Sequence, residues 1–81
     1  MPKSNTTPLL KYFSKQIILR RTQEKISQMQ LAEMVDCHLN TINNIETCRH
    51  DPTFEMAVKI SKVLKISLDK MVDYVLQEID I

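Results

Sequence analysis

SQMQLAEMVDCHLNTINNIE, residues 27–46, contains two short helical patterns that a turn separates. Ser27 and Gln30 form a capping box, in which each side chain satisfies an unpaired backbone amide at a helix start. The apolar residues that follow have the spacing of one buried helix face: Leu31, Ala32 and Val35. This pattern predicts a helix, a tight turn at residues 36–37 and a second helix.

The second helix carries many amide side chains. Ile42 and Ile45, three residues apart, face the core, so the residues before and between them are expected to face outward: Leu39, Asn40, Asn43 and Asn44. Asparagine offers a donor and an acceptor in one plane, which matches the N6 and N7 edge of adenine, and leucine can pack on a thymine methyl group. The alternative is that these asparagines are ordinary surface residues without a function. Asparagine has a poor helix propensity, however, and is therefore an unfavourable choice for such positions. The pattern favours a helix that reads base edges.

Four more segments complete the chain. Residues 1–8 contain two prolines and no periodicity, which is typical of a mobile tail. A helix is predicted from about Leu9 to near Lys25, with its apolar face at Leu10, Phe13 and Ile17. After a polar loop, Thr53 caps a helix with the apolar stripe Phe54, Ala57, Val58, Ile60 and Leu64. Ser67 and Asp69 start a last helix, at about residues 68–79. The fold class is therefore all-α, with five helices in one domain over residues 9–81.

Composition limits the function classes. The chain has 81 residues, of which 43% are apolar and four are aromatic, enough for one compact core. It contains no apolar run long enough to cross a membrane and no secretory leader pattern, so a cytoplasmic location is expected. The net charge is only +1, but residues 1–50 hold seven Lys or Arg against four Asp or Glu, while residues 51–81 hold four against six. The first half is therefore the more basic one.

Several short elements follow one another in order between residues 17 and 71. They are Arg21, Ile26-Ser27-Gln28, Leu31-Ala32, the turn at Asp36-Cys37, Thr41-Ile42, Ile45-Glu46, Pro52-Thr53, Leu64 and Ile66-Ser67-Leu68-Asp69. In this order and spacing they resemble the Cro and lambda-repressor type of helix-turn-helix protein, also called the XRE family. The resemblance implies a lambda-repressor-like five-helix domain and a transcriptional regulator that binds double-stranded DNA. It implies no enzymatic activity and no cofactor, and no small-molecule effector is evident.

The resemblance also implies roles for individual residues. The helix that follows Cys37 would be the recognition helix, with its base-contacting residues being His38, Leu39, Asn40, Asn43 and Asn44. Gln28 would meet a phosphate at a helix N-terminus, where backbone amides and the helix dipole favour an anion. The full set of expected phosphate contacts is Arg20, Arg21, Lys25, Gln28, Thr41, Thr47, Arg49 and His50. Arg21 and Glu46 would form the partly buried ion pair of the family and orient the arginine toward a phosphate.

The sequence departs from the family pattern at its turns and on its recognition helix. The family commonly has glycine at four positions that here are Lys25, Asp36, Cys48 and Lys65, and the chain has no glycine at all. Left-handed turns at these positions would each cost about 1 kcal/mol, with Asp among the better tolerated residues. The usual basic residues of the recognition helix are also absent, which favours A·T contacts over bidentate reading of guanine.

Metal or nucleophilic chemistry is the rival interpretation of Cys37, His38, Cys48 and His50. These residues are four possible zinc ligands, but their spacing matches no common zinc site. A cysteine nucleophile would need a cleft and an oxyanion hole, and so small a chain without glycine offers little of either. We therefore predict no metal and no catalysis. Two cysteines are also too few for a disulfide framework and fit a reducing compartment.

The last helix is more apolar than one small core requires. Its apolar residues are Leu68, Met71, Val72, Val75, Leu76 and Ile79. They predict a C-terminal dimerisation helix, although such a helix could also merely close its own domain. A homodimer would set two recognition helices about 34 Å apart and would bind a nearly palindromic operator.

A second class of function is compatible with the same fold. The domain could be a protein-interaction module, as in antitoxin or coactivator-like subunits, with weak DNA binding or none. Salt distinguishes the two, because phosphate contacts release counterions and an apolar interface does not. For a DNA-binding regulator the sequence leaves repression and activation open, with a repressor or autoregulator as the main expectation. It would be cytoplasmic, and associated with the nucleoid when bound.

Overall fold

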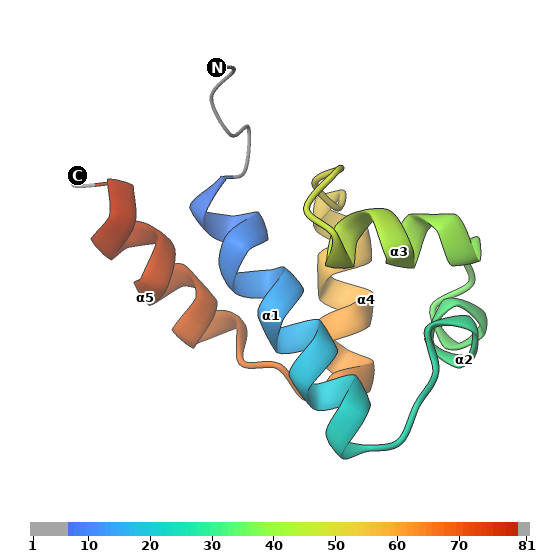
Figure 1. Ribbon diagram of the computed structural model, residues 1–81. Coiled ribbons are helices and arrows are strands. Elements are labelled where there is room, and N and C mark those ends of the chain that lie inside the picture. Colours follow the sequence, from blue (N-terminus) through green and yellow to red (C-terminus); the bar gives the residue numbers. More distant parts are fainter. Residues whose placement is uncertain (1–6, 80–81) are drawn as a thin grey trace.

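The computed structural model describes residues 7–79, which form five α-helices. These are α1 (Pro8–Gln23), α2 (Gln28–Met34), α3 (Leu39–Glu46), α4 (Phe54–Leu64) and α5 (Leu68–Ile79). No strand occurs within this range, so the all-α prediction is confirmed. α1 and α4 form the centre, α2 and α3 cross at one end, and α5 lies beside α1 at the other (Figure 1). Residues 1–6 of the predicted tail lie outside the described residues.

Side-chain caps fix where the helices begin. Ser27 and Gln30 form both bonds of the predicted capping box: the Ser27 amide donates to Gln30 Oε1 at 2.8 Å, and the Gln30 amide donates to Ser27 Oγ at 3.0 Å. Thr7 and Thr53 accept a bond from a first-turn amide of α1 and α4, at 3.1 and 3.0 Å. Each such cap stabilises its helix by about 1 kcal/mol. Local sequence chemistry therefore determines these three boundaries.

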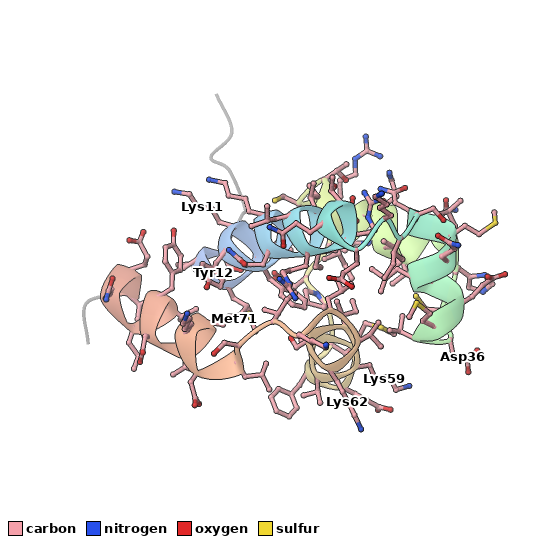
Figure 2. The ribbon with its side chains drawn as sticks, turned by 90° about the horizontal axis from the view of Figure 1, so that it is seen from below. Lys11, Tyr12, Asp36, Lys59, Lys62 and Met71 are labelled. Carbon is pink, nitrogen blue, oxygen red and sulfur yellow. The ribbon has the colours of Figure 1, made fainter. Side chains whose placement is uncertain are left out.

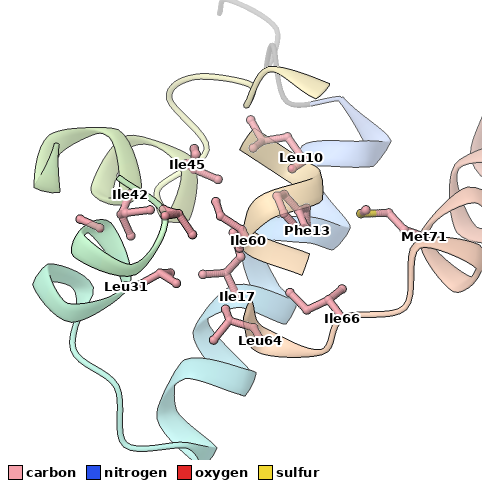
Figure 3. Close-up of a cluster of buried hydrophobic side chains, with 13 residues drawn as sticks. Leu10, Phe13, Ile17, Leu31, Ile42, Ile45, Ile60, Leu64, Ile66 and Met71 are labelled. Atoms are coloured by element: carbon pink, nitrogen blue, oxygen red, sulfur yellow. The ribbon is translucent and has the colours of Figure 1, made fainter. Parts of the chain in front are cut away.

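One apolar core holds the helices together (Figure 3). Its largest fully buried side chains come from four helices: Phe13, Ile17, Leu31, Ile42, Ile45, Ile60 and Leu64. Burial of a side chain of this size contributes about 1.5–3 kcal/mol. Ile42 and Ile45 thus fix one side of α3 to the core that it shares with α1 and α2, as their spacing predicts.

α5 is attached along one side only. Met71 is its one buried residue within the described range; its side chain projects from α5 toward the middle of the domain (Figure 2) and points toward Phe13 (Figure 3). Tyr74 packs on Tyr12 of α1 with ring centroids 4.9 Å apart. The predicted α4 stripe is wrong at Phe54, which is 84% exposed because it lies at the first turn of the helix, outside the core. Within residues 7–79, no helix combines the length and the hydrophobicity that a membrane span requires.

Four residues have left-handed backbone conformations, and none is glycine. Lys25, Asp36, Cys48 and Lys65 have φ values of 58°, 57°, 60° and 58°. They are the four positions at which the family that the sequence resembles commonly has glycine. Each lies just past a helix end, where the following amide donates back to the helix, as in the 2.9 Å bond from Cys37 to the Ala32 carbonyl. A Cβ atom in this conformation costs about 1 kcal/mol per residue relative to glycine.

Candidate nucleic-acid interface

The helix-turn-helix presents the outer side of α3. Ile42 and Ile45 are buried behind it, whereas His38, Leu39 and Asn40 at its start are exposed. Asn43 and Asn44 are only half-buried rather than fully outward as predicted. The loop after α3 folds back onto this end of the helix, where the amides of Arg49 and His50 donate to the Asn44 carbonyl at 2.8 and 3.3 Å. Thr41 is also half-buried on α3.

A buried polar network ties α3 to α1 and α2. Arg21 donates from Nε to Glu46 Oε2 at 2.8 Å and from Nη2 to Glu46 Oε1 at 3.0 Å, which is a bidentate ion pair. Gln28 Nε2 adds a third bond to Glu46 Oε1 at 2.9 Å, and Arg21 Nη1 donates to the Ile26 carbonyl at 3.0 Å. The side chain of Glu46 is 4% exposed and that of Arg21 is 18% exposed. Because Glu46 is the last residue of α3, this network fixes the orientation of the recognition helix.

The network changes how two of the expected phosphate contacts can work. Three of the five N–H donors of Arg21 already have partners within the fold. The side-chain amide of Gln28 is committed to Glu46, which leaves the backbone amides at the start of α2 as the free donors there. The Thr47 hydroxyl donates to the Asn43 carbonyl at 2.8 Å, and so its proton is also used within the fold. The side chains of Arg21, Gln28 and Thr47 therefore have fewer free donors for a phosphate, and they stabilise the arrangement of α2, α3 and the following loop.

Arg20, one of the expected phosphate contacts, bonds two groups within the fold. Its Nε atom donates to the Leu64 carbonyl at 2.9 Å, and its Nη1 atom donates to Gln23 Oε1 at 3.1 Å. The Leu64 carbonyl is at the C-terminal end of α4, at the opposite end of that helix from α3 (Figure 1). Arg20 thus satisfies a carbonyl that a helix end leaves without a partner. These two bonds use donors of the Arg20 guanidinium, and its phosphate contact stays a prediction.

Exposed basic side chains precede and follow the helix-turn-helix. Lys25 is exposed in the turn before α2, and Arg49 and His50 are exposed in the loop after α3. The anion-attracting groups therefore lie at both ends of the surface, with the amide and leucine side chains of α3 between them.

The two cysteines are free thiols in separate places. Burial raises the pKa of the Cys37 thiol above its ordinary value, the negative charge of Asp36 raises it further, and Lys59 acts in the opposite direction. Cys48 Sγ lies 3.2 Å from Ser14 Oγ, against the core. In the part of the chain that the structure describes, no three His, Cys, Asp or Glu side chains are grouped so as to hold a metal ion.

Comparison with family models places residues 17–71 in the helix-turn-helix family. The match covers more than half of the chain, and the α2–turn–α3 geometry lies within it. The chain belongs to the XRE type of this family, the Cro and lambda-repressor type, and is a DNA-binding regulator by class. Comparison with curated proteins and with solved structures gave no significant match.

Proposed function

We propose that the protein is a sequence-specific transcriptional regulator, acting as a repressor or autoregulator, that binds a palindromic operator as a homodimer in the cytoplasm. The observation that carries this proposal is the position of Leu39 and Asn40. They are exposed at the start of a helix that the buried residues Ile42 and Ile45 anchor from behind. A helix held in this way can enter a major groove with its N-terminal residues against the base edges.

Base recognition would come from a few uncharged side chains. Asn40 can bond the N6 and N7 edge of adenine in a bidentate manner, and Leu39 can pack on a thymine methyl group. His38 lies beside them, and Asn43 and Asn44 reach the bases only with their outer atoms because they are half-buried. The described part of α3 has no lysine or arginine, so an A·T-rich half-site is expected.

Phosphate contacts would supply most of the affinity. Arg49 and Lys25 are the exposed cations of the surface, and His50 is exposed beside Arg49. Gln28 lies in the first turn of α2, where free backbone amides favour an anion, and Thr41 lies in the first turn of α3. Arg21 and Thr47 would act chiefly by holding α3 and its following loop in place. Arg20 is a weaker member of this set, because two of its donors already bond the Leu64 carbonyl and Gln23 Oε1.

The direct experiment is selection of bound duplexes from a random pool by the 81-residue chain. The expected result is an enriched A·T-rich site with two-fold symmetry and half-sites one helical turn apart. Enrichment of a single half-site would remove the dimer from the proposal but leave base recognition intact. Recovery of the unselected pool would overturn sequence-specific binding.

Two substitutions separate the roles of the surface residues. Asn40→Ala should change the preference at one base position by about 1–3 kcal/mol. Arg49→Ala should weaken binding to all sequences alike and reduce the dependence on salt by about one phosphate contact. Gln77→Ala removes a similar exposed amide from α5 and is the control that should leave both properties unchanged. If Asn40→Ala behaved like Gln77→Ala, α3 would not be the reading element.

The competing function is a protein-interaction module of the same fold. The apolar surface around Phe54, which is 84% exposed, is the observation that favours it. The affinity of the DNA complex should fall steeply between low and moderate salt, whereas binding through an apolar surface should hardly change. Salt-independent DNA binding, or none, would favour the interaction module.

A further inference from the structure

The loop between α3 and α4, residues 47–53, carries two of the expected phosphate contacts, Arg49 and His50. α3 holds these two residues through one acceptor, the Asn44 carbonyl, to which both of their amides donate. On the side of α3 and α4 the loop borders a recess of about 200 Å³, whose walls include Asn44, His50 and Met56. Packing beneath the loop is therefore incomplete on this side, and its position depends on contacts elsewhere.

A buried serine of α1 contacts the first part of this loop. Ser14 is 4% exposed, and its Oγ atom lies 3.2 Å from Cys48 Sγ. Ser14 Oγ also donates to the Lys11 carbonyl at 3.3 Å, so the Cys48 thiol can serve as the donor to Ser14. Cys48 has the left-handed backbone, with φ 60°, that turns the chain at the end of α3. Because Arg49 follows directly, the contact with Ser14 helps to set the direction in which the loop leaves α3.

The N-cap residue of α1 contacts the last part of the loop. Thr7 Oγ1 donates to Asp51 Oδ1 at 3.1 Å, and it accepts a bond from the Leu10 amide at 3.1 Å. Asp51 is the only carboxylate in residues 47–53, and it directly follows His50. A carboxylate at this place attracts the neighbouring basic side chains and repels DNA phosphates. The bond to Thr7 holds it on the α1 side of the loop.

We infer that two polar residues of α1, Ser14 and Thr7, position the phosphate-contacting residues of this loop. Both belong to the N-terminal half of α1 or its cap, which lies beside the loop (Figure 1). Anchors at both ends of a segment fix its orientation as well as its position, whereas one anchor leaves it free to rotate. Ser14 is buried and acts only through the loop. The inference rests on the proposed function and adds to it the side chains that hold Arg49 and His50 in place.

Amide hydrogen exchange of the full chain tests the Ser14 anchor without DNA. The Arg49 and His50 amides bond the Asn44 carbonyl, so their exchange rates, relative to those of core amides in α4, report opening of the loop. Ser14→Ala removes one buried polar contact and should speed the exchange of both amides about three- to tenfold. Ser61→Ala is the matched control, because Ser61 is 3% exposed on α4 and its hydroxyl has no hydrogen-bond partner within the described residues. It should change these rates less than about twofold.

Two substitutions of Asp51 test the Thr7 anchor. Asp51→Asn and Asp51→Ala both remove the negative charge, which by itself should favour DNA binding equally in the two variants. Only Asp51→Asn keeps an oxygen that can accept a bond from Thr7. On a mixed-sequence duplex at low salt, Asp51→Ala should therefore bind about three- to tenfold more weakly than Asp51→Asn. The difference should disappear when Thr7 is replaced by valine, and equal affinities with Thr7 present would overturn this anchor.

The effect of Ser14 on DNA binding should depend on the residues that it positions. On the same duplex, Ser14→Ala should raise the dissociation constant about three- to tenfold in the otherwise wild-type chain. It should raise it less than about twofold in a chain in which Arg49 and His50 are both alanine, because the two effects share one route. An equal factor in both chains, or equal amide exchange in Ser14→Ala and Ser61→Ala, would overturn the inference. A wild type that binds no duplex would refute the proposed function, and the exchange rates would still decide whether α1 holds the loop.

Discussion

Replacing Lys65 by glycine should stabilise the protein. Lys65 caps α4 with φ 58° and ψ 42°, and its exposed side chain leaves the Cβ atom as the only group that opposes this conformation. Removing the Cβ atom relieves about 1–2 kcal/mol of steric cost. The greater freedom of glycine in the unfolded chain takes back about 0.5–1 kcal/mol. The net gain is about 1 kcal/mol, which for a domain of this size raises the melting temperature by about 4–8 °C.

Lys62→Gly is the matched control for this prediction. Lys62 is exposed three residues earlier, within the α4 helix, where glycine costs about 1 kcal/mol. The two variants lose the same charge and the same side chain, so opposite shifts in melting temperature isolate the effect of the left-handed backbone. Calorimetry at one protein concentration provides the measurement. If Lys65→Gly lowered the melting temperature as Lys62→Gly does, the turn would not have the strained geometry described above.

Three further perturbations test other parts of the fold. Asp36→Gly should also raise the melting temperature, by less than Lys65→Gly because Asp tolerates the left-handed region better; an unchanged or lower value would mean that the turn differs. Glu46→Gln should lower the free energy of unfolding by about 3 kcal/mol, because it leaves the Arg21 charge without a charged buried partner. Glu55→Gln breaks an exposed ion pair and should change the free energy of unfolding by less than about 1 kcal/mol. Equal losses for the two variants in urea titrations would refute this reasoning. The pKa of the Cys37 thiol is raised in the folded state, so the thiol contributes stability at pH values below the ordinary thiol pKa, and this contribution is lost as the pH rises through the pKa of the folded state. Cys37→Ala should therefore reduce the loss of stability at alkaline pH. A profile of stability against pH that is the same in both proteins would contradict this prediction.

Much of the fold can be predicted from sequence because its determinants are local. The capping box of Ser27 and Gln30 is visible as a spacing, and so is the pair of core isoleucines on α3. The four left-handed residues could be predicted because the family pattern has glycine at those positions, and the chain keeps the geometry without it. Local hydrogen bonding and helix periodicity are sufficient for such features.

The parts that could not be predicted depend on contacts between distant residues. Arg20 and Arg21 are neighbours in a basic pair, yet one bonds the end of α4 and the other bonds Glu46 on α3. The sequence shows two positive charges and not the 100° rotation around α1 that separates them. Phe54 reads as core because it continues an apolar stripe, but helix-end geometry places it on the surface. Such outcomes require the packing of several helices at once.

The strained turns and the uncovered α5 face have a joint consequence for stability. Four left-handed residues without glycine cost on the order of 4 kcal/mol together, which is a large fraction of the roughly 5–15 kcal/mol that stabilises a domain. Association of a folded monomer with a second copy stabilises it by about 2.7 kcal/mol when the partner is at a hundred times the dissociation constant. In the proposed homodimer, folding, dimerisation and operator binding are therefore linked through concentration. Dilution should weaken operator binding and lower the melting temperature together. In the Lys65→Gly variant, dilution should still weaken operator binding, but the melting temperature should stay higher than that of the wild type, because the substitution stabilises the monomer and not the dimer.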